Sequence, residues 1–291
     1  MTDFVQLLVA GVSIGSIYAM VAVGFVLLWQ TSNTINFAQG EFVVLPAFAM
    51  VLFLSFRLPF AAALLATILV STLLLGLLVK KALVERLLAA GVLPLVISTI
   101  GLSLLIRYSL QRFWTAQALP FPPLFSREPI RLGTIILQRE ELMNVLFAGV
   151  AIGALQLFVK RTKLGWAMQA VAQNRTLAAV LGIDVSRLVT LTFMLNAALT
   201  AGAAVLIAPV YLVKYDIGIG LGLKAFYAAI IGGFNQVRGA LLGGLLVGVV
   251  ETLAAAYVSS QFRDAVALLI LIGVLLLKPE GLWGVREEWS S

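Results

Sequence analysis

The sequence VQLLVAGVSIGSIYAMVAVGFVLL runs from Val5 to Leu28 without a charged residue. A helix of roughly 20 residues crosses the hydrocarbon core of a bilayer, so this run is long enough to span one. It is apolar on every face, whereas a transmembrane strand alternates polar and apolar positions over about 10 residues. The run therefore predicts a transmembrane α-helix, because a helix satisfies its backbone hydrogen bonds within the segment.

Similar runs fill the rest of the chain. Of its 291 residues, 62% are hydrophobic and 11% are charged, which is typical of an integral membrane protein. By length we predict about eight to nine hydrophobic segments, at 5–28, 37–56, 59–79, 92–114, 142–159, 188–212, 223–234, 239–258 and 264–277. The seventh is too short to cross and contains Gly232-Gly233, which indicates a broken or half-spanning helix. The predicted fold is an all-α, polytopic transmembrane helical bundle that forms one transmembrane domain over residues 1–291.

The basic residues predict which loops face the cytoplasm, because short cytoplasmic loops carry an excess of lysine and arginine. One basic loop holds Lys80, Lys81 and Arg86, and a second, over residues 160–187, follows two spans later. Both are predicted to be cytoplasmic, which places the N-terminus and the 113–140 connection outside. The net charge of +7 fits anionic membrane lipid and a cytoplasmic partner, and no basic stripe with interleaved aromatics suggests nucleic acid.

Missing residue types exclude several kinds of chemistry. The chain has no cysteine and no histidine, which removes thiol catalysis, disulfides and the common zinc sites. It also lacks the Gly-x-x-x-x-Gly-Lys-Ser/Thr phosphate loop, so we do not expect it to hydrolyse ATP. We therefore predict a protein that is not an enzyme and has no catalytic residue, metal or cofactor of its own. Energy for transport would come from a partner or a gradient.

Small residues four positions apart predict close helix packing. The pairs are Gly11 with Gly15, Gly149 with Gly153, Gly239 with Gly243, and Gly244 with Gly248. The stretch Gly11-Val-Ser13-Ile-Gly15 also spells a nucleophile elbow. Because the chain has no histidine to act as its base, we interpret this stretch as a packing face.

Two polar stretches interrupt the hydrophobic segments, one at 34–41 and one at 232–239. Paired interruptions in two halves of a transporter indicate a substrate site made of broken helices. There, freed N–H groups and helix N-termini hold an anionic group such as a carboxylate. The alternative, which the residues favour about equally, is two polar turns at the membrane surface.

Two charged residues, Arg107 and Glu251, lie within apolar runs. Each costs about 2.5–3.5 kcal/mol at mid-membrane unless it is paired or hydrated. Counted along helices that rise from the cytoplasmic side, both lie roughly 20 Å from that face. We favour a structural ion pair between them over a role in lining a transport path.

The stretch from Arg161 to Asp184 is the one long, basic, amphipathic segment of the chain. Residues Gly165 to Leu181 are predicted to form a helix with an apolar face, ended by Gly182. A helix of this kind outside the bilayer is suited to contact a soluble partner. The alternative is an interfacial helix that lies on lipid headgroups.

Short motifs are spread along nearly the whole chain: Ile17-Tyr18-Ala19, Asn36-Phe37-Ala38-Gln39-Gly40-Glu41, Ser98-Thr99-Ile100-Gly101-Leu102, Arg161-Thr-Lys-Leu-Gly165, Ala172–Ile183, Lys224-Ala-Phe226 with Gly232-Gly233, Gly239–Gly243, Glu251, and Lys278-Pro279-Glu-Gly281-Leu282. Together they resemble the permease subunits of branched-chain amino-acid ABC importers, the leucine/isoleucine/valine type. The family usually has histidine where Gln39 stands, arginine where Gln169 stands and glutamate where Leu177 stands. The change at Gln39 puts a charge-based role at that position in doubt.

The resemblance implies an assembly in the bacterial inner membrane. Two permease subunits, usually different, pack on two cytoplasmic ATP-binding subunits and receive substrate from a periplasmic substrate-binding protein. The cytoplasmic loop 161–187 would contain the coupling helix, with contacts to the ATPase at Gly165, Asn174, Ala178, Ala179, Gly182 and Ile183. The expected substrate path is lined by Tyr18, Asn36, Phe37, Gln39, Gly40, Glu41, Gly232, Gly233, Asn235 and Gln236.

The predicted function is that of a permease that moves a small solute along a central path while partner subunits hydrolyse ATP. Few ionisable side chains in the spans suit a zwitterionic solute with an apolar tail, such as a branched-chain amino acid. Urea, short amides and aromatic acids are alternative substrates within the same family. Two other classes are a self-sufficient secondary carrier, which would need an ion site, and an intramembrane enzyme, which would need a catalytic constellation.

Overall fold

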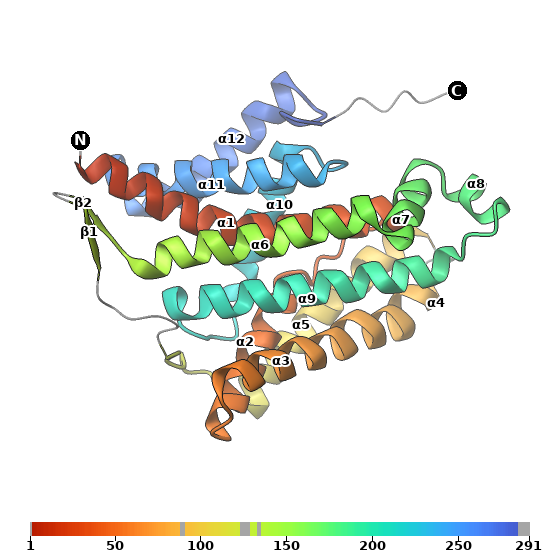
Figure 1. Ribbon diagram of the computed structural model, residues 1–291, viewed down its shortest axis with the longest axis horizontal. Helices are drawn as coiled ribbons and strands as arrows, with labels where there is room; N and C mark the ends of the chain where they lie inside the picture. Colours follow the sequence, from red (N-terminus) through yellow and green to blue (C-terminus); the bar gives the residue numbers. More distant parts are fainter. Residues whose placement is uncertain (1, 88–90, 123–128, 133–134, 285–291) are drawn as a thin grey trace. The chain divides into compact units, whose positions relative to one another are not determined.

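The computed structural model describes residues 2–87, 91–122, 129–132 and 135–284, and within these ranges the chain is helical apart from one short hairpin and the connecting turns (Figure 1). The elements are, in chain order, α1 (Thr2–Ser32), α2 (Glu41–Ser55), α3 (Phe60–Ser71), the π-helical segments η1 (Thr72–Leu78) and η2 (Lys80–Val84), α4 (Glu85–Leu87), α5 (Val92–Phe113), β1 (Ile130–Leu132), β2 (Ile135–Leu137), α6 (Arg139–Arg161), α7 (Lys163–Gln173), α8 (Arg175–Val180), α9 (Val185–Tyr211), α10 (Ile217–Gly232), α11 (Val237–Tyr257), the 3₁₀ turn η4 (Ser260–Phe262) and α12 (Arg263–Leu277). Parts of the connection predicted to lie outside, residues 123–128 and 133–134, fall outside the described residues.

All nine predicted hydrophobic segments are helices. Seven helical stretches of the described chain are long and apolar enough to cross a membrane. The other two, α2 and α10, have 15 and 16 residues. At 1.5 Å per residue they extend about 22–24 Å, which is less than the ~30 Å of a hydrocarbon core. The prediction of a polytopic helical bundle with half-spanning helices is confirmed.

The helices form two compact units, each built from several chain segments. One unit comprises residues 1–26, 123–149 and 223–291, and the other comprises residues 27–122 and 150–222. We call them the α11 unit and the α9 unit after the helix that each contains in full. The boundaries fall inside α1, α6 and α10, so neither unit is a continuous stretch of chain.

Glycines bring α1 and α11 together in the α11 unit. A Cβ added at Gly15 would lie 2.8 Å from the carbonyl oxygen of Gly244, and one at Gly11 would lie 2.7 Å from Cα of Val249. Positions rise along α1 as they fall along α11, so the two helices are antiparallel. This close backbone approach confirms the predicted packing of Gly11, Gly15, Gly244 and Gly248.

The other two glycine pairs differ from each other. A Cβ at Gly239 or Gly243 would collide with the backbone of α10 at Gly232 or Ala228, so this pair also packs closely. Nothing lies within 4 Å of a Cβ at Gly149 or Gly153, so within the described chain the prediction fails for α6. The four-residue spacing of glycines predicts that a helix has a face of small residues, but it does not predict which helix packs against that face.

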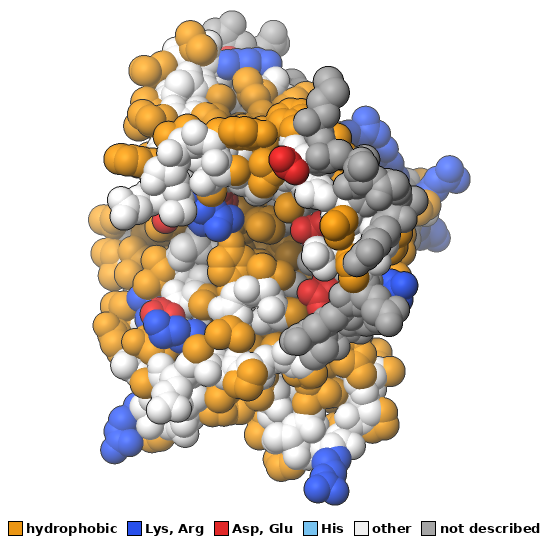
Figure 2. Space-filling model, turned by 90° about the vertical axis from the view of Figure 1, so that its left-hand side faces the viewer, with side chains coloured by type: hydrophobic (Ala, Val, Ile, Leu, Met, Phe, Trp, Pro, Cys, Tyr) orange, Lys and Arg blue, Asp and Glu red, His pale blue; other side chains and the backbone are white. Residues whose placement is uncertain are grey.

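A cluster of large apolar side chains forms the core of the α9 unit. Phe42, Leu75, Leu95 and Phe193 are all buried in it. A Cβ at Gly76 would lie 2.7 Å from Cα of Met194, so η1 lies directly on α9. Burial of this apolar surface holds α2, η1, α5 and α9 together. Hydrophobic side chains also cover much of the molecular face in Figure 2, as expected for helices that meet lipid.

Candidate functional site

The polar stretch after α1 is a tightly hydrogen-bonded turn in the α9 unit. The Asn36 side-chain oxygen accepts the Ala38 N–H at 3.1 Å, and its backbone oxygen accepts the Gln39 N–H at 3.1 Å. The Thr99 hydroxyl of α5 accepts the Phe37 N–H at 3.2 Å. An asparagine that bonds its own backbone two residues ahead favours such a turn over a continued helix. The predicted interruption at 34–41 is therefore confirmed as a break between α1 and α2.

Gln39 fixes this turn to α9. Its Nε2 donates to Oδ1 of Asn196 at 2.7 Å, and Nδ2 of Asn196 donates back to its Oε1 at 3.0 Å. Both side chains are fully buried. A neutral amide pair explains how glutamine can occupy this position without a charge, because each amide satisfies the other.

Gly40 brings the N-termini of α2 and α10 together. It is the residue before α2, and a Cβ there would collide with the backbone of Gly218, in the first turn of α10. A Cβ added at Gly222, one turn further along α10, would also lie close, at 3.1 Å from the Gly40 nitrogen. Two short helices thus begin at one place, so the positive ends of their dipoles point to a shared region.

Within the α9 unit, the first interruption meets the start of α10, which follows the break between α9 and α10. α9 ends at Tyr211, residues 212–216 are not helical, and α10 begins at Ile217. In both places a long helix, a non-helical link and a short apolar helix follow one another. In the sequence, the close approach at α10 corresponds to the spacing Gly218-x-Gly220-x-Gly222, which carries no polar side chain.

The second predicted interruption does exist, but it packs against its own chain in the α11 unit. Gly232 closely approaches Gly239 of α11, and Gly233 has a φ of 110°. The Leu282 N–H donates to the Ile231 oxygen at 2.8 Å, so the C-terminal tail covers the end of α10. Glycine is needed at 232 and 233 for these backbone contacts. Asn235 and Gln236 lie in the turn that follows and are partly buried.

Arg107 pairs with Glu41, the first residue of α2. Its Nη2 lies 2.8 Å from Oε1 of the carboxylate and its Nε lies 3.3 Å from the same oxygen. Seven residues later on each helix, Phe48 and Trp114 meet edge to face with ring centroids 5.2 Å apart. Contacts repeated at equal spacing show that α2 and α5 run parallel at this point.

Glu251 pairs within the α11 unit, so the predicted Arg107–Glu251 ion pair is wrong. The fully buried Glu251 contacts Lys224 of α10 and lies 2.5 Å from Nε of Arg263. Each charge pairs instead with a residue of a neighbouring helix in its own unit. Lys224 also lies 5.8 Å from the ring centre of buried Tyr18, which places that residue beside the Glu251 cluster.

The basic amphipathic segment is two helices with a bend between them (Figure 1). Asn174 ends α7 and caps α8, because its side-chain oxygen accepts the Leu177 N–H at 2.9 Å. This corrects the prediction of one helix over Gly165 to Leu181: asparagine competes for backbone hydrogen bonds and favours a cap. Gly182, with a φ of 84°, ends α8 as predicted.

The end of α8 is closed by a hydrogen-bonded turn and exposes apolar side chains. Ile183 N–H donates to the Ala178 oxygen at 3.0 Å, and Gly182 N–H donates to the Ala179 oxygen at 3.0 Å. Ala178 is buried, whereas Val180 and Leu181 are each 79% exposed. The end of α8 therefore presents an exposed apolar surface.

The corner before α7 holds this surface in place. The Thr162 hydroxyl accepts the Gly165 N–H at 3.0 Å, and a Cβ at Gly165 would lie 2.5 Å from Cα of Val159. Trp166 and Gln169 donate side-chain N–H groups to carbonyl oxygens at the end of α6, each at 2.7 Å. The unpaired carbonyls of a helix C-terminus are thereby satisfied.

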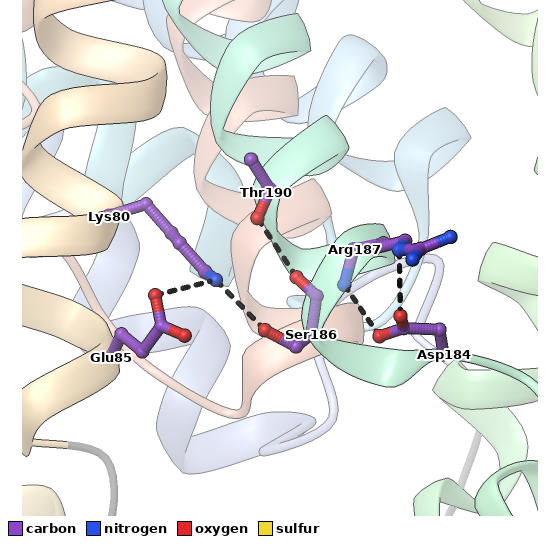
Figure 3. Close-up of polar contacts among 6 residues, drawn as sticks. All are labelled: Lys80, Glu85, Asp184, Ser186, Arg187 and Thr190. Carbon is purple, nitrogen blue, oxygen red and sulfur yellow. Dashed lines mark hydrogen bonds and ion pairs between the residues drawn. The ribbon is translucent and has the colours of Figure 1, made fainter.

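Beyond α8, charged residues tie the segment to the rest of the α9 unit (Figure 3). Asp184 caps α9 through the Arg187 N–H at 3.0 Å. Lys80 of η2 donates to the Ser186 hydroxyl at 2.9 Å and pairs with Glu85 at 3.2 Å. The start of α9 is thus linked directly to η2. No group of three or more carboxylates that could hold a metal ion is found in the described ranges.

Comparison with known proteins gives a consistent result. Residues 7–275 match the model of the family described as branched-chain amino acid transport system, permease component. The chain is 35% identical to the high-affinity branched-chain amino acid transport system permease protein BraD of Pseudomonas aeruginosa, over 98% of this chain and 97% of that one. It is 30% identical to LivH of Escherichia coli K12, a permease protein with the same description, over 98% and 96% of the two chains.

A more distant relative has another description. The autoinducer 2 import system permease protein LsrC of Enterobacter sp. strain 638 is 32% identical over 66% of this chain and 57% of its own length. No solved structure matches the chain.

Proposed function

The chain belongs to the family of branched-chain amino acid transport system permease components, and from this we propose that it forms the membrane path of an ATP-driven importer of branched-chain amino acids. Permease subunits of this family lack an ATPase domain, and this chain has no phosphate-binding loop of its own. Hydrolysis therefore takes place on two cytoplasmic ATP-binding subunits. A second permease subunit and a periplasmic substrate-binding protein complete the assembly in the inner membrane.

The meeting of α2 and α10 at Gly40 and Gly218 is the observation that carries the proposal. Neither helix is long enough to cross a membrane, so two helix N-termini can lie within the hydrocarbon region. Broken helices of this kind are the usual setting of a substrate site in transporters, because their N-termini attract a carboxylate. We assign the path to the turn Asn36–Glu41 and to the first two turns of α10.

The chemistry of this region suits a small zwitterion with an apolar tail. Asn36 and Gln39 supply neutral polar groups, and Glu41 and Arg107 supply one charge of each sign. Phe37 stays 41% exposed although its neighbours in the turn are buried, so it offers an apolar surface. The remaining predicted path residues, Tyr18 and the 232–236 turn, have structural partners in the α11 unit.

The ATPase contact is assigned to α7 and α8. Exposed Leu177, Val180 and Leu181 fit an apolar groove on a partner, and the hydrogen-bonded corner at Gly165 makes the surface rigid. Motion of the partner would reach α9 through Asp184 and η2 through Ser186 and Lys80. Packed and hydrogen-bonded contacts of this kind can carry coupling between separate sites.

Reconstitution tests the proposal. The permease is co-expressed with the partner permease and ATPase subunits encoded beside it and is placed in liposomes with the binding protein. We expect uptake of L-leucine or L-valine that requires both ATP and the binding protein. Uptake by this chain alone would indicate a secondary carrier. ATP-dependent uptake of urea or a short amide, without uptake of leucine or valine, would show that the protein is an importer permease for a different substrate.

A further inference from the structure

The Glu41–Arg107 ion pair is more deeply buried than a surface bridge. The side chain of Glu41 is 2% exposed and that of Arg107 is 15% exposed. Removal of two charges from water is costly, and such a pair is often no more stabilising than apolar residues of the same volume. Its presence at the start of α2 therefore suggests a role beyond stability.

The guanidinium of Arg107 engages only one of the two carboxylate oxygens of Glu41. Both bonds from the guanidinium run to the same carboxylate oxygen, Oε1, whereas an arginine fork engages both oxygens of a carboxylate. Arg107 makes one more contact, in which Nη2 donates to the Ser103 hydroxyl at 3.2 Å. A one-oxygen pair can be opened from one side without a complete rearrangement.

An unused donor lies in the same turn. Nδ2 of Asn36 is buried and has no hydrogen-bond partner, although Oδ1 of the same amide accepts the Ala38 N–H. A buried donor without an acceptor costs about 1–3 kcal/mol. Such a cost is understandable where a ligand supplies the acceptor.

We propose, on the basis of the function above, that the solute passes this turn by exchanging with the ion pair: its ammonium group binds Glu41 while its carboxylate binds Arg107 and accepts from Nδ2 of Asn36. A zwitterion is neutral overall, so its insertion leaves every buried charge paired. A solute with only one of the two charges would leave one member of the pair unpaired, which is strongly unfavourable in a low-dielectric site. The pair thus selects for the amino-acid head group.

A purely structural role would be to hold α5 against α2. The edge-to-face contact of Phe48 with Trp114 already joins the same two helices two turns away. Thr99 and Phe37 add a third contact between α5 and the turn. The two roles make different predictions for a variant in which both charges are removed together.

The experiment measures leucine transported per ATP hydrolysed in liposomes that contain the complete complex and binding protein. This ratio does not depend on how much complex is recovered. The test variant is the double substitution Glu41→Gln/Arg107→Gln, which leaves no unpaired charge. The matched control is Arg57→Gln, which removes an exposed arginine from the turn after α2.

We expect the double variant to assemble and hydrolyse ATP while leucine per ATP falls at least about tenfold, because the head group loses both charged partners. Arg57→Gln should keep the wild-type ratio. If the double variant does not assemble, the conservative change Arg107→Lys keeps the charge but not the fork and should still lower the ratio.

A wild-type ratio in the double variant, or in Arg107→Lys if only that variant assembles, would overturn the exchange and leave a structural pair. Failure of the proposed function looks different, since the wild-type complex would then import neither leucine nor valine.

Discussion

Replacement of Gln39 by leucine should strongly destabilise the permease, because it removes one half of a fully buried amide pair. In the wild type, Gln39 and Asn196 exchange hydrogen bonds of 2.7 and 3.0 Å. The substitution leaves both Nδ2 and Oδ1 of Asn196 without these bonds inside the α9 unit. Each buried group without a partner costs about 1–3 kcal/mol, so the expected loss is about 2–6 kcal/mol.

The double substitution Gln39→Leu/Asn196→Leu should recover most of that loss, because two apolar groups of similar shape replace two mutually satisfied polar groups. We expect it to lie within about 1.5 kcal/mol of the wild type, the usual cost of a volume-conserving change in a core. The free energy of unfolding is measured by SDS titration of the purified permease in lipid micelles, followed by the fluorescence of its 5 tryptophans.

The double-mutant cycle measures the interaction energy between Gln39 and Asn196. Two residues that share a hydrogen-bond network show an interaction energy well above the ~0.5 kcal/mol scatter of independent sites. If the two single losses simply add in the double variant, Gln39 and Asn196 do not support each other and the turn is held by other contacts.

Three further outcomes follow from the same contacts. Gly40→Ala should abolish uptake and lower the yield of folded permease, because the added Cβ would collide with the backbone of Gly218. The matched control is Gly220→Ala, whose Cβ meets nothing within 4 Å and which should keep uptake and yield near the wild-type values. Glu251→Gln should lower the unfolding free energy by about 3–5 kcal/mol, since it removes the fully buried negative charge that pairs with Lys224 and Arg263, and an unchanged SDS midpoint would contradict this. Leu181→Asp should reduce co-purification of the ATPase subunits at least about tenfold while insertion is normal, and normal co-purification would exclude α8 as the contact.

The helices were predictable because their signal is local. A run such as Val5–Leu28 carries its own evidence of length and apolarity, and each predicted segment became a helix. The break at Asn36 was also predictable, since polar residues interrupt an apolar run there. Gly182 could be recognised as a helix end from its position after an amphipathic stretch.

The pairing of distant elements was not predictable in the same way. The contact between the start of α10 and the first turn was not predictable, because glycines such as Gly218 show their purpose only when Gly40 lies against them. The count along the helices predicted similar depths for Arg107 and Glu251, but a predicted depth does not specify the neighbouring helix. A single sequence contains no measure of which faces meet, and so the partners of buried charges came from the structure alone.

The claim that the turn at Asn36–Glu41 borders the transport path is tested most directly by chemical labelling. The chain has no native cysteine, so a single Phe37→Cys variant can be treated with a small, polar, membrane-impermeant thiol reagent in the reconstituted complex. Leu69→Cys, at an exposed apolar position of α3, is the lipid-facing control.

We expect Phe37→Cys to react faster than Leu69→Cys, and we expect its rate to change when ATP is trapped on the partner subunits, because access to the path alternates between the two sides of the membrane. A cysteine at position 37 that stays as inert as the control in every nucleotide state would contradict the account.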